Sequence, residues 1–175
     1  SSWSVINGLY SDMSLKVTWS LHGRRMLRRF LFLAPMLLVA VWVLRWAGLR
    51  GYLGVPIDIK LLGLLIENPT FWVMFMLIYP TSSVWPQEMI YRRFFIVRYR
   101  PTLGDGVWLI LVNALVFGWA HVLYEKSWAI FFTLIGGWLF AETYHRTRLL
   151  LSVCLEHALY GCWLFSVGLG SYFLG

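Results

Sequence analysis

Long apolar segments alternate along the chain with shorter polar and basic stretches. Five of these segments are predicted to be membrane-spanning helices, at about residues 30–49, 69–84, 107–124, 127–144 and 149–168. A helix needs about 20 mainly apolar residues to cross a bilayer, and the five segments approach or reach that length. The pattern therefore predicts an all-α fold, a polytopic transmembrane helix bundle with about five full spans.

The connections between these spans are rich in glycine, proline and charged residues. We expect residues 50–68 to form a loop that contains a short re-entrant or interfacial helix near Lys60–Ile66. Glu125–Lys126 and His145–Arg148 are short and polar, so we expect tight turns there. These connections leave no room for a separate soluble domain.

One further helix is predicted after the second span. Pro86 suits the first position of a helix, and the helix is expected to end in the basic stretch of residues 92–100, closed by Pro101 and Gly104. A charged helix of this kind need not cross the bilayer. We predict that it is only partly inserted.

The composition supports a membrane protein. Of the residues, 59% are hydrophobic and 13% are charged, whereas soluble domains have about 45–50% apolar and about 25% charged residues. The high hydrophobicity also excludes a disordered chain. We expect an N-terminal cytoplasmic or interfacial segment, residues 1–29, followed by a single integral-membrane domain, residues 30–175.

The placement of the positive charges predicts an orientation. With the basic collar of Arg24, Arg25, Arg28 and Arg29 on the inner side, eleven Lys and Arg residues fall inside and four fall outside. Cytoplasmic loops carry an excess of Lys and Arg, so the N-terminus is predicted to be cytoplasmic. We expect a multi-pass protein of a bacterial inner (cell) membrane. The lipid bilayer, not nucleic acid, then accounts for the net charge of +7.

Several ionisable residues lie inside the apolar segments, where they are costly. They are Glu88, His121, Glu142, Glu156 and His157. A carboxylate and two histidines on three different helices can hold a water inside a bilayer and take its proton. The second imidazole can donate to a developing oxyanion. This chemistry fits hydrolysis of a peptide bond or another acyl group.

Each of these residues also has a structural interpretation. Glu88 can be a helix-start carboxylate paired with Arg92, four residues on. His121 can be a core histidine that bonds a backbone carbonyl, with Asn113 nearby. For Glu142 the preferred interpretation is a structural ion pair with Arg146. The remaining candidates for support of the site are Gln87, Tyr91, Glu156 and Tyr160.

Three motifs resemble those of the CPBP family, the CAAX proteases and bacteriocin-processing enzymes, also called Abi. Its eukaryotic relatives are the type II CAAX prenyl endopeptidases. The family pattern is Glu-Glu-x-x-x-Arg, then Phe-x-x-x-His, then His-x-x-x-Asn/Asp, each on its own membrane helix. The matching segments are 87–92, 117–121 and 157–161. The order, the spacing and the apolar setting agree over about residues 69–170.

The resemblance implies a glutamic intramembrane endopeptidase with Glu88, His121 and His157 as catalytic residues. Its motif-one Glu and motif-two His activate a water, and its motif-three His and an Asn or Asp stabilise the oxyanion. Two positions depart from the pattern: Gln87 replaces the first Glu, and Gly161 replaces the Asn or Asp. Glu88 can take over as base if the helix turns by one residue, about 100°.

The residue that replaces the missing motif-three donor is left open between Tyr160 and Cys162. No cofactor is expected. One Glu and two His could hold zinc, but the His-Glu-x-x-His spacing of zincins is absent from the sequence, so we predict no metal.

The predicted substrate is a membrane-anchored or lipidated peptide or protein. The alternative is a catalytically silent CPBP-like subunit of a larger membrane complex. A third, weaker hypothesis is a tetrapyrrole-binding bundle with His121 or His157 as axial ligand. Purified protein colour tests the third hypothesis, and cleavage assays separate the first two.

Overall fold

The computed structural model describes residues 22–39, 42–43, 62–124 and 127–170, and this part of the chain is helical with short connections. The all-α prediction is confirmed there. The elements are a helix at 22–39, α2 (Gly63–Glu67), α3 (Pro69–Tyr79), the π-helical turn η1 (Pro80–Val84), α4 (Trp85–Glu88), the π-helical turn η2 (Met89–Phe94), α5 (Phe95–Leu103), α6 (Val107–Ala120), the 3-10 turn η3 (His121–Tyr124), α7 (Ser127–Thr147) and α8 (Leu150–Ser166).

Across those described ranges, none of the helices combines the length and the apolar character that a bilayer crossing requires. The polytopic part of the prediction therefore stays a prediction.

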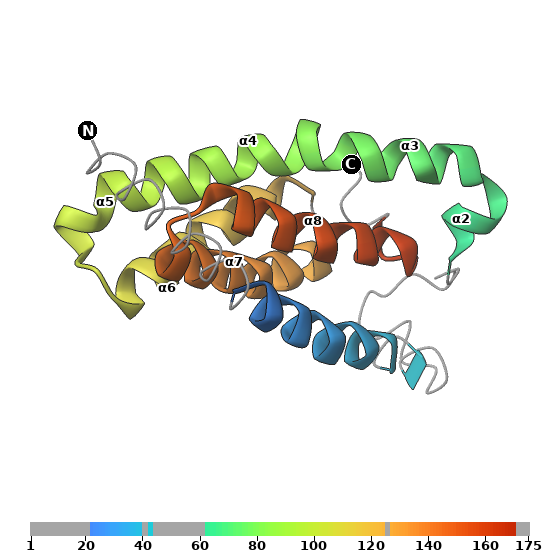
Figure 1. Ribbon diagram of the computed structural model, residues 1–175, viewed down its shortest axis with the longest axis horizontal. Helices are drawn as coiled ribbons and strands as arrows, with labels where there is room; N and C mark the ends of the chain where they lie inside the picture. The colour runs from blue at the N-terminus through green and yellow to red at the C-terminus, as the bar shows by residue number, and fades with distance from the viewer. Residues whose placement is uncertain (1–21, 40–41, 44–61, 125–126, 171–175) are drawn as a thin grey trace, which may run out of the picture.

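A single helical run extends from α3 through α5 (Figure 1). The side chain of Asn68 accepts a hydrogen bond of 3.1 Å from the backbone N–H of Phe71, and Pro69 occupies the first helical position. These are the signals of a helix start. The run ends at Leu103, before Gly104 at φ 78°, a conformation that favours glycine.

The expectation that a new helix starts at Pro86 is wrong, because the run passes through both Pro80 and Pro86 without a break. A proline lacks the N–H and its ring crowds the carbonyl one turn earlier. The run widens into a π turn at Pro80, and wider turns are a known way to accommodate such a disturbance.

The buried residues of this run form a straight stripe, namely Val84, Glu88, Arg92 and Ile96. They are spaced four apart. In an ideal α-helix with 3.6 residues per turn, such a stripe would rotate by about 40° at each step. The π turns η1 and η2 form hydrogen bonds between residues five apart instead of four, so each turn contains more residues. This offsets the rotation and keeps the stripe facing the rest of the protein.

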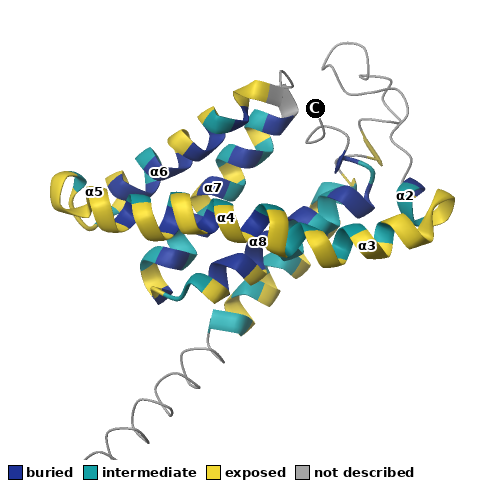
Figure 2. Ribbon diagram, turned by 90° about the horizontal axis from the view of Figure 1, so that it is seen from above, coloured by how far each residue is buried: buried dark blue, intermediate teal, exposed yellow. Residues whose placement is uncertain are grey.

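The helices α6, α7 and α8 form the centre of the bundle (Figure 1). The main apolar cluster joins Leu109 and Phe117 of α6, Phe140 and Tyr144 of α7, and Val153 of α8, with Ile96 of α5 added at its edge. Figure 2 shows the buried residues on the facing sides of these helices, whereas the α3–α5 run exposes much of its surface.

Three other predicted boundaries differ from the structure. The helix at 22–39 includes the basic collar, which therefore is helical. Helix α7 continues to Thr147, so the tight turn predicted at His145–Arg148 is wrong; Arg148 N–H still bonds the carbonyl of Tyr144 at 2.8 Å. The short helix predicted near Lys60–Ile66 is observed as α2, although residues 44–61 lie outside the described part, as does the turn at residues 125–126.

Candidate active site

Glu88 lies fully buried at the end of α4, between the two π turns. Its Oε1 is 2.7 Å from Nδ1 of His157, which comes from α8, 69 residues later. Its Oε2 is 3.2 Å from Nε of Arg92, one turn further along the same run. The structure thus joins the first and third sequence motifs through a buried carboxylate–imidazole contact.

Gln87 does not share this position. It is half-buried, and its Nε2 donates to Oγ of Ser83 at 2.9 Å on its own helical run. Because adjacent helical positions are about 100° apart, only one of residues 87 and 88 can face α8. Between the two π turns, the residue that faces α8 is Glu88 and not Gln87. This is the rotation of the helix by one residue that a catalytic Glu88 requires.

His157 is held on three sides. Its ring stacks on Phe140 of α7 at 4.5 Å between centroids, with 18° between the planes. Its Nδ1 contacts Glu88 and its Nε2 lies 3.3 Å from the hydroxyl of Tyr79. An ionised carboxylate can only accept hydrogen bonds, so Nδ1 carries the proton that points to Glu88.

His121 lies where α6 passes into the 3-10 turn η3. Its Nδ1 donates to the backbone carbonyl of Phe117 at 2.8 Å, so Nε2 is the acceptor nitrogen of the neutral ring. The Phe117 ring lies 4.8 Å from the His121 ring and 5.9 Å from the His157 ring. The Phe117 ring is therefore a common neighbour of the two histidines.

The guanidinium of Arg92 is buried against aromatic rings. Its central carbon lies 4.4 Å from the centroid of Phe117 and 5.7 Å from that of Phe140. Stacking of this kind suits the planar arginine head rather than a lysine. Asn113 donates its side-chain amide to the carbonyl of Tyr91, which fixes α6 against the motif-one helix.

Within the described residues, several buried polar atoms around Glu88 have no hydrogen-bond partner in the protein. They are Oδ1 of Asn113 and the two Nη atoms of Arg92, together with Oε2 of Glu88 and Nε of Arg92, which form the ion pair with each other. Buried polar groups are nearly always paired with protein or water. The surroundings of Glu88 are thus polar enough to hold a small polar group or a water.

The supporting residues separate into two groups. Tyr91 packs on Phe117 at 5.1 Å, inside the Glu88 site. Glu156 instead approaches Arg29 of the N-terminal helix at 3.8 Å, and the Tyr160 ring packs on Phe30 at 5.5 Å. Both residues therefore contact the helix at 22–39, which was not expected from their positions next to His157.

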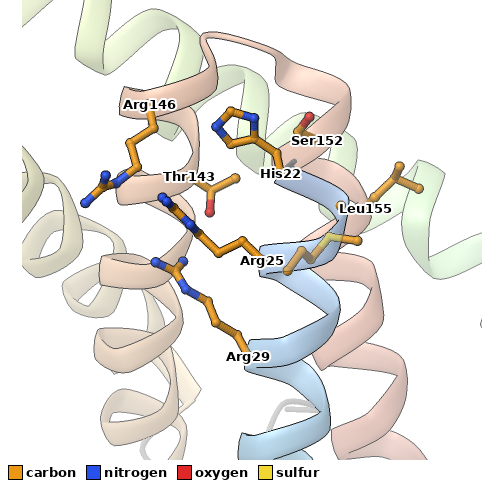
Figure 3. Close-up of a pocket in the computed structure, with 9 residues that line it drawn as sticks. His22, Arg25, Arg29, Thr143, Arg146, Ser152 and Leu155 are labelled. Carbon is orange, nitrogen blue, oxygen red and sulfur yellow. The ribbon is translucent and has the colours of Figure 1, made fainter. Parts of the chain in front are cut away.

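A second polar region lies between the N-terminal helix, α7 and α8. A small pocket is lined there by basic, hydroxyl and apolar side chains, including His22, Arg25, Thr143, Arg146 and Ser152 (Figure 3).

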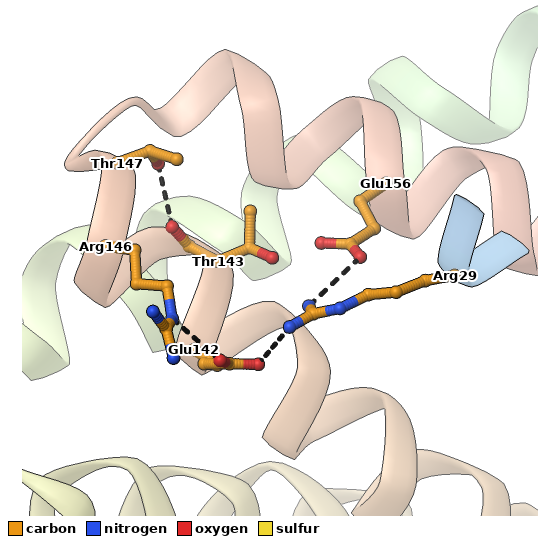
Figure 4. Close-up of polar contacts among 6 residues, drawn as sticks. All are labelled: Arg29, Glu142, Thr143, Arg146, Thr147 and Glu156. Atoms are coloured by element: carbon orange, nitrogen blue, oxygen red, sulfur yellow. Dashed lines mark hydrogen bonds and ion pairs between the residues drawn. The ribbon is translucent and has the colours of Figure 1, made fainter. Parts of the chain in front are cut away.

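Below this pocket, a network of ion pairs joins the same helices. Arg29 pairs with both Glu142 and Glu156, and Arg146 donates to Glu142 at 2.7 Å (Figure 4). The pairing of Glu142 with Arg146 that the sequence predicted is confirmed.

Sequence reasoning missed one residue of the site, Tyr79. It belongs to none of the motifs and lies nine residues before Glu88 in an apolar segment, so no spacing pointed to it. In the part of the chain that is described, no group of three or more His, Cys, Asp or Glu side chains is arranged to hold a metal ion.

A model of the type II CAAX prenyl endopeptidase Rce1-like family matches residues 68–163. The match covers more than half of the 175 residues and includes all three motifs. The chain belongs to this family, a protease family of membrane proteins, and the resemblance seen in the sequence is confirmed. No curated protein and no solved structure matches the chain.

Proposed function

We propose that the protein is an intramembrane endopeptidase that hydrolyses a peptide bond of a membrane-anchored or lipidated substrate, with Glu88 as general base. The observation that carries the proposal is the buried contact of 2.7 Å between Glu88 and His157. The contact brings together a carboxylate and an imidazole from two motifs that are far apart in the sequence. Such a pair is what a water-activating site requires.

In the proposed reaction, Glu88 accepts a proton from a water, and the oxygen of that water attacks the carbonyl carbon of the scissile bond. His121, with its acceptor Nε2, orients the water together with Glu88. The carbonyl oxygen becomes an oxyanion that donors on the His157 side stabilise. The proton then passes from Glu88 to the leaving amine, the carbon–nitrogen bond breaks, and the carboxylate is regenerated.

The distribution of side chains supports a position inside a membrane. Large apolar residues such as Trp119, Leu123 and Leu77 are strongly exposed, whereas Glu88 and Arg92 are fully buried. Soluble monomers rarely expose large contiguous apolar patches, and intramembrane ionisable residues face the bundle interior. A lipid-anchored substrate would reach the site from the bilayer.

The test is peptide cleavage by the purified protein in lipid vesicles. The probe is a fluorogenic peptide with a prenylated cysteine at the fourth position from its C-terminus, the arrangement of a CAAX signal, and the same peptide without the prenyl group is its control. Glu88→Gln removes the motif-one carboxylate, so cleavage should fall by about 10²–10⁴-fold, the usual contribution of general-base catalysis.

Gln87→Glu is the matched variant, because it restores the family's Glu-Glu pair without touching Glu88. It should keep or raise the wild-type rate. If wild type and Glu88→Gln cleave nothing while Gln87→Glu cleaves the probe, the protein is a catalytically silent member of the family. The presence of Gln87 and Gly161 is the observation that favours that second function.

A further inference from the structure

Tyr79 occupies the space next to Gly161. A methyl group added at Gly161 would overlap the Tyr79 hydroxyl and would lie 2.5 Å from its Cε1 and 2.6 Å from its Cζ. Carbon atoms that are not bonded do not approach so closely. The side chain of residue 161 and the Tyr79 phenol therefore exclude each other, and in this protein the phenol is present.

The same hydroxyl faces the outer nitrogen of His157. Nδ1 of His157 carries the proton that points to Glu88, so in the neutral form of the ring Nε2 is an acceptor. The Tyr79 O–H, 3.3 Å away, is then the donor of that contact. On this side of the imidazole the hydroxyl, not the ring, has a proton to offer.

Tyr79 is held firmly enough to act as a fixed donor. Its ring stacks on Phe75 at 5.3 Å with 17° between the planes, and it lies 5.6 Å from Phe165 of α8. Nearby, Trp72 of α3 donates to Oγ of Ser166 at 3.0 Å, which fixes α3 against α8. Tyr79 is also the last residue of α3, directly before the π turn at Pro80.

We propose that Tyr79 supplies the hydrogen-bond donor that position 161 lacks: its hydroxyl contacts Nε2 of His157 in the free protein and turns its one proton to the oxyanion when the substrate reacts. The contact between Tyr79 and His157 does not depend on the proposed function, whereas the donation to the oxyanion rests on it. Tyr79 replaces Tyr160 and Cys162 as candidates, because both lie about 100° away from residue 161 around α8, whereas Gly161 is one turn from His157 on the same face.

The first test reads the His157 bond without any catalysis. In protein labelled with ¹⁵N-histidine, Tyr79→Phe should move the Nε2 resonance of His157 toward that of an unbonded acceptor. Tyr99→Phe is the matched control, because Tyr99 is exposed on α5 and packs on Phe95. An unchanged Nε2 resonance in Tyr79→Phe overturns the proposal, whatever the cleavage results.

The second test uses the prenylated peptide. Tyr79→Phe should lower kcat by about 10²–10³-fold with little change in KM, because an oxyanion donor acts mainly in the transition state. A wild-type rate in Tyr79→Phe overturns the donor role. If the wild type cleaves nothing but Tyr79→Phe still shifts the His157 resonance, the Tyr79–His157 bond is supported. Only the hydrolase function is then contradicted.

A swap tests the mutual exclusion of the two side chains. Gly161→Asn alone should lower the unfolding temperature, because the new side chain collides with Tyr79. Combining it with Tyr79→Ala should restore part of both the stability and the rate, so the two changes should be strongly non-additive. If the losses in stability and rate of the two single variants simply add in the double variant, the side chains at positions 79 and 161 do not occupy the same space. That result would overturn the proposal.

Discussion

At the residue scale, the proposed function depends on which of two neighbours faces α8. Glu88 contacts His157, and Gln87 contacts Ser83 of its own helical run. Arg92 then balances the buried carboxylate from one turn away, with its guanidinium packed on Phe117. A buried charge without a partner is strongly destabilising, and Arg92 provides that partner and orients the carboxylate.

Arg92 and the adjacent Arg93 offer a direct comparison. Arg92→Lys keeps the charge but loses the planar head. A hydrogen bond to a charged group contributes about 1.5–3 kcal/mol, so kcat for the prenylated peptide should fall by about 10- to 100-fold. Arg93 is exposed, and Arg93→Lys should leave the rate unchanged. Equal rates for the two variants would refute the orienting role of Arg92.

At the element scale, close packing of α6 against α7 positions the aromatic rings that line the site. A Cβ added at Gly137 of α7 would lie 3.1 Å from Cα and 3.2 Å from the carbonyl oxygen of Ala114 on α6. Small residues let helix backbones approach in this way. The approach sets Phe117 and Phe140 at a centroid distance of 6.4 Å, and these rings line Arg92 and His157.

Gly137→Ala should therefore destabilise the bundle. The added methyl group meets backbone, which cannot rotate away as a side chain can, so we expect a loss of about 1–3 kcal/mol in the free energy of unfolding. Gly23→Ala is the control, because an added Cβ there meets nothing within 4 Å and should stabilise its helix by about 0.4–1 kcal/mol. Thermal unfolding in detergent micelles measures both. A neutral Gly137→Ala would contradict the tight contact.

At the scale of the whole molecule, the three basic segments assigned to one side of the membrane gather together. Arg29 of the collar and Arg146 meet at Glu142. Asp105, in the connection from α5 to α6, pairs with Arg100 and with Arg148, and accepts a hydrogen bond of 2.7 Å from His145. The same segments carry the positive charges counted as inside, and the orientation itself stays a prediction.

The Asp105 cluster makes stability depend on pH. Desolvation opposes ionisation, but the hydrogen bonds from His145 and Arg148 and the charges of Arg148 and Arg100 outweigh it and lower the pKa of the Asp105 carboxyl. A pKa that is lower in the folded state stabilises the fold above the unfolded value of about 3.9, and this contribution disappears as the pH falls through the folded value.

Asp105→Asn should consequently lower the unfolding temperature at pH 7, and the difference from wild type should shrink as the pH is lowered below about 4. Other carboxylates titrate in both proteins, so only the difference between them is informative. A difference that stays constant from pH 7 to pH 3 would show that the ionised Asp105 contributes nothing to stability.

The sequence alone determined the helical class, the approximate position of most helices, and Glu88, His121 and His157 as candidates. Apolar runs and motif spacings are local properties, so they can be read without knowledge of contacts. Even the pairing of Glu142 with Arg146 follows from helical spacing.

The tertiary structure decided which groups meet. The continuation of the helix through Pro80 and Pro86 depends on π turns that keep a stripe buried, and hydrophobic periodicity cannot reveal them because it assumes one regular pitch. The contact between Tyr79 and His157 depends on α3 packing against α8, 78 residues away in sequence. Side chains that far apart are brought together by the packing of whole helices, which no local pattern encodes.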